Sequence, residues 1–123
     1  MVVQDVGFAL NPLMVEGQMH GGGVQSIGFG LYEALVYDEE GQLLSGSFMD
    51  YALPRIDNVP PPETIMVENP SPHGPFGARG IGAPPITAEP AALANAIPSA
   101  CGVRLTELPL RTERVWQALQ QEK

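Results

Sequence analysis

The chain has 123 residues, which is enough for one ordinary domain or for a piece of a larger one. Its 14 glycines and 13 prolines make up about a fifth of the residues, roughly twice the usual share. A hydrophobic content of 44% and a charged content of 16% exclude a disordered linker. The net charge of −8 argues against a protein that binds nucleic acid through its phosphates, and the single Cys101 excludes an internal disulfide.

A short strand and a long helix are the first predicted elements. Residues 2–6 predict the strand, Gly7 closes it, and Asn11-Pro12 predicts a turn. Residues 13–35 have helical periodicity. An apolar stripe on this helix consists of Val24, Ile27, Leu31 and Leu35. The stripe beside it has almost no side-chain bulk and consists of Gly17, Gly21, Gln25, Gly28 and Tyr32.

The glycine-rich face needs an explanation, because glycine costs about 1 kcal/mol per helical position relative to alanine. One explanation is close packing of another backbone segment against this face. The other is a ligand held against the helix backbone, with Gln25 offering both a donor and an acceptor. The residues alone leave both explanations open.

The middle of the chain predicts a hairpin, with strands at 34–37 and 43–46 around the turn at 38–41. Residues 51–62 are rich in proline and predict an irregular extended crossing. Residues 64–68 predict a further strand, and 69–85 form a long loop rich in glycine and proline. Ordered loops of this length are usually functional.

The last part of the chain predicts two helices with a strand between them. Thr87 is placed to cap a helix that runs to about residue 97, before Pro98 and Gly102. A strand follows at 103–108. Thr112 is placed to cap the last helix, whose inward residues are expected to be Val115, Trp116 and Leu119.

The order β-α-β-β-β-α-β-α indicates an α+β fold with a mixed, largely antiparallel sheet and about three helices. We expect residues 1–123 to form a single unit. The opening residues lack the basic segment of a secretory signal, and the longest apolar run is broken by Gly28, Gly30 and Glu33. We therefore expect no membrane insertion and a soluble setting.

Several standard catalytic sites are absent from the sequence. His20 and His73 are too far apart for zinc spacing, and no Gly-x-Ser-x-Gly or phosphate-binding loop occurs. We expect no metal ligand from this chain. The remaining candidate is the loop 77–85, where Gly77, Gly80 and Gly82 would expose backbone N–H groups to a ligand. A plain tight connection is the competing explanation, in which Arg79 is simply solvated or ion-paired.

An ordered set of motifs resembles the C-terminal part of the molybdenum-binding large subunit of the xanthine dehydrogenase, aldehyde oxidase and carbon monoxide dehydrogenase family. The resemblance covers essentially the whole chain. The matching segments are Asp5–Gly7, Asn11-Pro12, Val15–Gly28, Ser47–Pro54, Gly80–Pro85, Pro90–Ala96 and Leu108–Trp116. Since that subunit is several times longer, the resemblance implies a fragment of a larger cofactor-binding domain.

The resemblance implies a molybdenum–molybdopterin cofactor, with the cytosine dinucleotide form as one alternative. It also implies the remainder of the subunit, an iron–sulfur subunit and an FAD subunit as partners, with a homo-oligomer as a further alternative. A cytoplasmic location is expected, with export alongside partner subunits as the alternative. The positions that it assigns to cofactor contact are Gly22, Gly23, Gln25, Arg79, Gly80, Ile81 and Gly82.

The chain departs from the family's pattern at Ala83. The family's motif reads Gly-x-Gly-Glu here, and its glutamate is the catalytic base, whereas this chain reads Gly80-Ile81-Gly82-Ala83. A methyl group cannot accept a proton, and Glu89 lies six residues further on, in the next helix. Two interpretations follow: a subunit fragment of a molybdenum hydroxylase that is inactive alone, or a degenerate paralogue that serves as a structural or interaction module.

Overall fold

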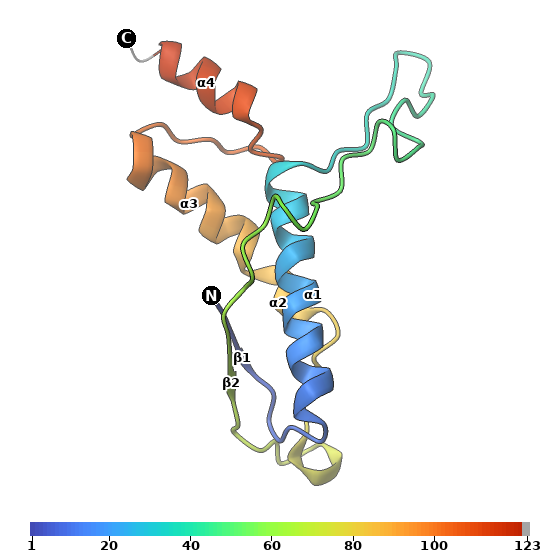
Figure 1. Cartoon of the computed structure of the whole chain (residues 1–123), viewed down its shortest axis with the longest axis vertical. Helices are drawn as coiled ribbons and strands as arrows, with labels where there is room; N and C mark the ends of the chain where they lie inside the picture. Colours follow the sequence, from blue (N-terminus) through green and yellow to red (C-terminus); the bar gives the residue numbers. More distant parts are fainter. Residues whose placement is uncertain (122–123) are drawn as a thin grey trace.

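The computed structural model describes residues 1–121. Its elements are β1 (Val2–Asp5), α1 (Pro12–Leu31), β2 (Thr64–Val67), the 3-10 turn η1 (Pro75–Gly77), α2 (Pro84–Thr87), α3 (Glu89–Cys101) and α4 (Thr112–Gln121). The long axis of the molecule follows α1, with the sheet beside the first half of this helix and α3 beside the second half (Figure 1). The chain is α+β, as expected, and no helix within residues 1–121 is long and apolar enough to cross a membrane.

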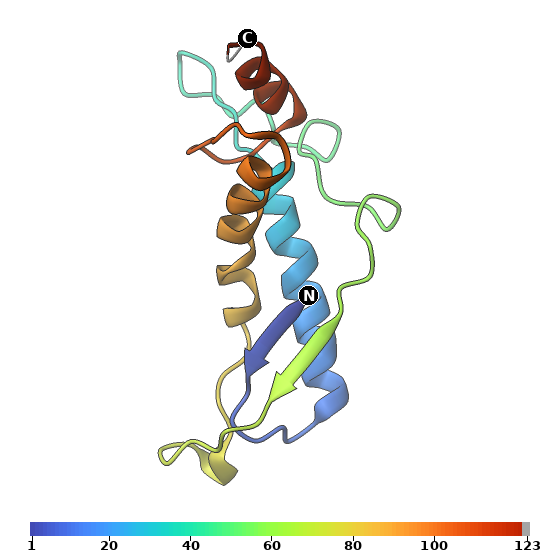
Figure 2. The same cartoon turned by 90° about the vertical axis from the view of Figure 1, so that its left-hand side faces the viewer.

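The sheet has two strands and is parallel, so the expected antiparallel arrangement is wrong. β1 and β2 pair from Val2 opposite Thr64 to Asp5 opposite Val67, and Figure 2 shows the two arrows side by side. Parallel neighbours require a long crossover, which α1 and the arm after it supply. The core cluster under the sheet consists of Val2, Val6, Val15 and Met19.

The segment expected to form a hairpin contains one antiparallel bridge, between Tyr37 and Leu43. The Ser45 hydroxyl accepts a hydrogen bond from the Val36 N–H at 2.9 Å and donates one to the Ala34 carbonyl at 3.0 Å. A side chain therefore satisfies backbone groups that a longer ladder would have paired. Two backbone hydrogen bonds flank the bridge, from the Leu44 N–H to the Val36 carbonyl at 2.8 Å and from the Asp38 N–H to the Gln42 carbonyl at 3.0 Å. The predicted hairpin is therefore present in a short form, without two extended strands.

The strand expected at 103–108 is also wrong, because this segment is irregular. Val103 is 1% exposed and Leu110 is 3% exposed, and the Leu110 N–H donates to the Gly30 carbonyl at 2.6 Å. The segment thus packs across the end of α1. None of the described strands lies beside it to form a ladder.

Helix α1 begins at Pro12 because Asn11 caps it. The Asn11 Oδ1 accepts a hydrogen bond from the Met14 N–H at 3.2 Å, and proline at the first position lacks the N–H that would stay unsatisfied there. The helix ends at Leu31, four residues before the predicted end. The next two N–H groups both donate to the Gly28 carbonyl at 2.9 Å, which closes the last turn.

The packed face of α1 includes Gly28 of the predicted glycine stripe and otherwise lies next to that stripe. Gly17 and Gly21 have no atom within 4 Å of the position that a Cβ would take, and Gln25 is exposed. The residues buried at helical spacing are Val15, Met19, Gly22, Ser26 and Gly30. Close packing therefore explains part of the glycine content, because Pro85 approaches Gly22 and Leu93 approaches Gly30. Of the predicted apolar stripe, Leu35 is 61% exposed.

The helix predicted from Thr87 to about residue 97 is α3, which is preceded by Ala88 and runs from Glu89 to Cys101, so the expected capping role of Thr87 is wrong. The short α2 ends at Thr87. Helix α3 continues through Pro98 and ends before Gly102, whose φ of +88° is a conformation that glycine adopts readily. On α4, the Trp116 side chain is 61% exposed. Its expected inward orientation is therefore wrong within this chain.

An arm at residues 33–60 leaves the end of α1, projects away from the helices and returns to α1 at Pro54 (Figure 1). Its base is held by the Tyr51 hydroxyl, which donates to the Glu33 carboxylate. This hydrogen bond raises the pKa of Tyr51 above its usual value of 10.0. The arm carries Phe48, Met49 and Ile56 at 85%, 93% and 99% exposure. Apolar side chains this exposed are typical of a surface that another protein segment covers.

Candidate functional site

The long loop before α2 is fastened to the end of β1. The Arg79 N–H donates to the Val6 carbonyl at 3.0 Å, and the Arg79 Nε lies 3.4 Å from an Asp5 carboxylate oxygen. Gly7 adopts a φ of +71°, and a Cβ there would collide with the Gly77 carbonyl. The loop can therefore approach β1 this closely only because residue 7 is glycine.

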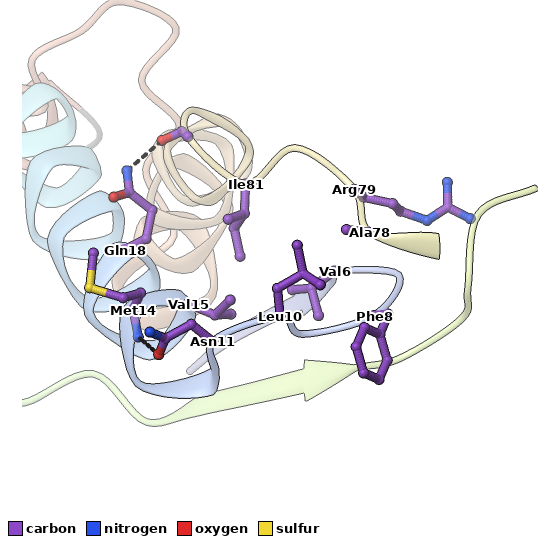
Figure 3. A pocket seen from close by; sticks show the side chains of 11 residues that line it. Val6, Phe8, Leu10, Asn11, Met14, Val15, Gln18, Ala78, Arg79 and Ile81 are labelled. Carbon is purple, nitrogen blue, oxygen red and sulfur yellow. Dashed lines mark hydrogen bonds between the residues drawn. The ribbon is translucent and has the colours of Figure 1, made fainter. Parts of the chain in front are cut away.

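A cavity of about 290 Å³ opens between this loop, the segment after β1 and the first turns of α1. Figure 3 shows its lining side chains. They are mostly apolar, with Asn11, Gln18 and Arg79 as the polar exceptions. The apolar residues that line it are Val6, Phe8, Leu10, Met14, Val15, Ala78 and Ile81. An apolar pocket with a few polar groups is the usual form of a small-molecule site.

Gln18 is the α1 side chain that reaches the loop. Its Nε2 donates to the Gly82 carbonyl at 2.8 Å, as the dashed line in Figure 3 shows. Gln25 lies two turns further along the same face, about 10 Å away along the helix axis, and does not line this cavity. Gln18 was not among the residues predicted for the site. The spacing of seven residues to Gln25 was the signal that could have found it, because residues seven apart share a helix face.

The backbone at residues 80–83 has unused hydrogen-bond donors. Among the described residues, none of these four N–H groups donates a hydrogen bond. Gly80 and Gly82 also have no atom within 4 Å of the position of a Cβ, and Ala83 is exposed. Consecutive free N–H groups are suited to binding an anionic or oxygen-rich ligand.

Arg79 is partly committed to the protein. Besides its ion pair with Asp5, its guanidinium donates to the Asn69 carbonyl at 3.3 Å. Its side chain is 40% exposed, so one edge of the guanidinium is still accessible. Its expected contact with a cofactor stays a prediction.

Gly22 and Gly23 face the protein's own atoms. A Cβ on Gly22 would lie 2.6 Å from the Pro85 Cβ, and one on Gly23 would lie 3.1 Å from a Val2 methyl group. The Ser26 hydroxyl donates to the Ile86 carbonyl at 2.9 Å and fixes the same junction. The two glycines therefore hold α2 and β1 against α1, and their expected cofactor contact stays a prediction.

We expect Gln18→Ala to loosen the loop without unfolding the chain. One neutral hydrogen bond contributes about 1 kcal/mol, so hydrogen exchange of the hydrogen-bonded amides at residues 77–79 should accelerate about fivefold. Gln25→Ala is the matched control, because its side chain is exposed and makes no hydrogen bond among the described residues. Equal exchange in both variants would show that Gln18 does not restrain the loop.

Residues 1–60 match the family model of the molybdopterin cofactor-binding domain. The chain is 44% identical over 119 residues to the nicotine 6-hydroxylase large subunit of Paenarthrobacter nicotinovorans, with 94% of this chain and 15% of that protein covered. It is 37% identical over 116 residues to the xanthine dehydrogenase molybdenum-binding subunit of Escherichia coli, with 94% and 15% covered.

Solved structures agree with these relatives. Quinoline 2-oxidoreductase from Pseudomonas putida superposes with a TM-score of 0.89 at 36% identity, covering 97% of this chain and 16% of that one. The aldehyde oxidoreductase from Desulfovibrio desulfuricans gives a TM-score of 0.84 at 39% identity, covering 94% and 12%. The chain thus spans about a sixth or less of the proteins that it matches.

The fold and the sequence define a segment of a molybdopterin-binding domain. The chain belongs to the family of molybdenum-binding large subunits that includes xanthine dehydrogenases, aldehyde oxidoreductases and carbon monoxide dehydrogenases. Among the described residues, no group of three or more His, Cys, Asp and Glu side chains is placed to hold a metal ion.

Proposed function

We propose that this chain forms one wall of the molybdenum-cofactor pocket of a molybdenum hydroxylase, as a C-terminal fragment that is inactive alone. The observation that carries the proposal is the row of free N–H groups at residues 80–83, held beside α1 by Gln18. Phosphate, pterin and metal-oxo groups all present oxygen atoms that such donors bind. The residues present therefore fit the cofactor.

In this arrangement the residues of the chain would bind the cofactor and orient it. Gly80, Ile81 and Gly82 would present their N–H groups to the cofactor, and Arg79 would offer its accessible edge. Gln18 joins this set because it restrains the Gly82 carbonyl. The molybdenum–molybdopterin group, when bound, supplies the redox chemistry of oxidative hydroxylation. Candidate substrates are aldehydes, purines, other N-heterocycles or carbon monoxide.

The proposed partners are the remainder of the large subunit, an iron–sulfur subunit and an FAD subunit. The chain spans only about 15% of its curated relatives, and the arm exposes Phe48, Met49 and Ile56. Surfaces of this kind are suited to burial against other protein segments. A cytoplasmic location is proposed with them.

The proposal is tested by the cofactor content of the assembled protein. We expect the chain, produced with the rest of its subunit and partners, to contain molybdenum by elemental analysis and a pterin by fluorescence after oxidation. An assembly without molybdenum and pterin would contradict the proposal. Release of a cytosine nucleotide on hydrolysis would identify the dinucleotide form.

The second candidate is a catalytically degenerate module that kept the fold. Ala83 favours it, because no carboxylate stands at the position where the family has its base. Glu89 does not replace it. Its carboxylate lies against Gly23, which is turned about 140° around α1 from Gln18. The two candidates differ in how the assembly responds when the carboxylate is restored.

A further inference from the structure

A second cavity, of about 490 Å³, lies between α3, the start of β1 and the proline-rich crossing that precedes β2. Most of its wall is apolar and includes Val2, Ile27 and Pro62. The charged groups of its lining residues are the Glu63 and Glu89 carboxylates and the Met1 amino group, and none of the lining side chains is basic. The cavity therefore has mostly apolar walls, and its two carboxylates give it a net negative charge.

The carboxylate of Glu89 is incompletely satisfied. Its Oε2 is buried and has no hydrogen-bond partner among the described residues. Its Oε1 lies 3.4 Å from the position that a Cβ on Gly23 would take, so the carboxylate faces α1 at this glycine. A buried carboxylate oxygen without a donor costs stability. A donor at this position would remove that cost.

The described part of the chain does not supply this donor. Its ion pairs join Arg79 to Asp5 and Arg114 to Glu107. The whole chain carries only six lysines and arginines against fourteen acidic residues. A bound divalent cation does not suit the cavity either, because such ions need several oxygen ligands and these walls are apolar.

We propose that this cavity receives a lysine or arginine side chain from the part of the large subunit outside these 123 residues, with its nitrogen paired to Glu89 Oε2. The apolar walls suit the methylene stem of such a side chain, and the carboxylate suits its charged end. The chain's net charge of −8 and its 15% share of its relatives' length point to a basic occupant from elsewhere in the subunit. This inference rests on the proposed function, since it requires the rest of the subunit to be present.

The test compares Glu89→Gln with Glu63→Gln in the assembled protein. Both variants replace a carboxylate that lines the same cavity, but Glu63 is exposed and does not have the buried unpaired oxygen. We expect Glu89→Gln to lower the thermal unfolding midpoint by several degrees, because it leaves a buried cation unpaired. Glu63→Gln should leave the midpoint nearly unchanged.

An unchanged or raised midpoint in Glu89→Gln would overturn the proposal, because neutralising a truly unpaired carboxylate relieves a cost. If Glu89→Gln does not assemble, an experimental structure of the unaltered assembly decides. A lysine or arginine nitrogen within 4 Å of Oε2 supports the proposal, and water or an apolar group there refutes it. Molybdenum content is measured on the same samples. An assembly without cofactor would contradict the proposed function, whereas the unfolding midpoints of the two variants could still be compared.

Discussion

Replacing Ala83 by glutamate is expected to raise the hydroxylation rate of the assembled protein by a factor of about 10² to 10⁴, the usual contribution of a general base. Ala83 is exposed and directly follows the row of free N–H groups at 80–82. A longer side chain therefore has room to reach a ligand held there. The measurement is kcat with aldehydes and N-heterocycles as substrates.

Ala83→Gln is the matched control for this experiment, because an amide has nearly the same size as a carboxylate but is a far weaker base. A gain in both variants would show that side-chain size, not proton transfer, limits the rate. The gain in Ala83→Glu should also fade as the pH falls below the usual pKa of glutamate, about 4.3. Ordinary hydroxylation rates in the unaltered assembly would rule out the degenerate interpretation.

Gly22→Ala is expected to destabilise the protein by about 1 to 3 kcal/mol, the cost of overpacking a close contact. The new methyl group would lie 2.6 Å from the Pro85 Cβ. Pro85 is buried at the start of α2, directly after the 80–83 loop, and cannot move without shifting that loop. The free energy of unfolding, measured by urea titration, tests this expectation.

Gly21→Ala is the control for this prediction, because it makes the same chemical change one position away. No atom lies within 4 Å of its new methyl group. Alanine is the better helix former, so this variant should gain about 0.5 to 1 kcal/mol. A similar change in free energy for both variants would mean that α1 does not pack on α2 through Gly22.

Local signals predicted most of the elements correctly. The two strands near 2–6 and 64–68 and the helices after Asn11 and Thr112 are present close to the expected positions. These predictions depend on caps, on periodicity and on β-branched residues, which act within a few neighbours. The predicted hairpin at 34–46 forms only as a short one around the Tyr37–Leu43 bridge, and beyond it the Ser45 side chain pairs the Val36 N–H and the Ala34 carbonyl.

The sequence identified a candidate loop, and the roles assigned to its residues stay predictions. The loop 77–85 was correctly singled out as the irregular, glycine-rich segment, and the structure shows free N–H groups in it. Gln25 was predicted to contact the cofactor, and that stays a prediction; the structure adds Gln18, which was not predicted and which reaches the Gly82 carbonyl. Helical periodicity defines a face, but it does not say at which turn another segment crosses that face.

By itself, the sequence determined the family, the order of the main helices and the absence of a carboxylate at position 83. These depend on residue identity and on neighbours along the chain. Only the tertiary structure decided that the two strands are parallel, that Gly22 rather than Gly21 receives a neighbour, and that the Glu89 oxygen is buried without a donor. Each of these depends on contacts between segments far apart in the chain, which local patterns do not specify.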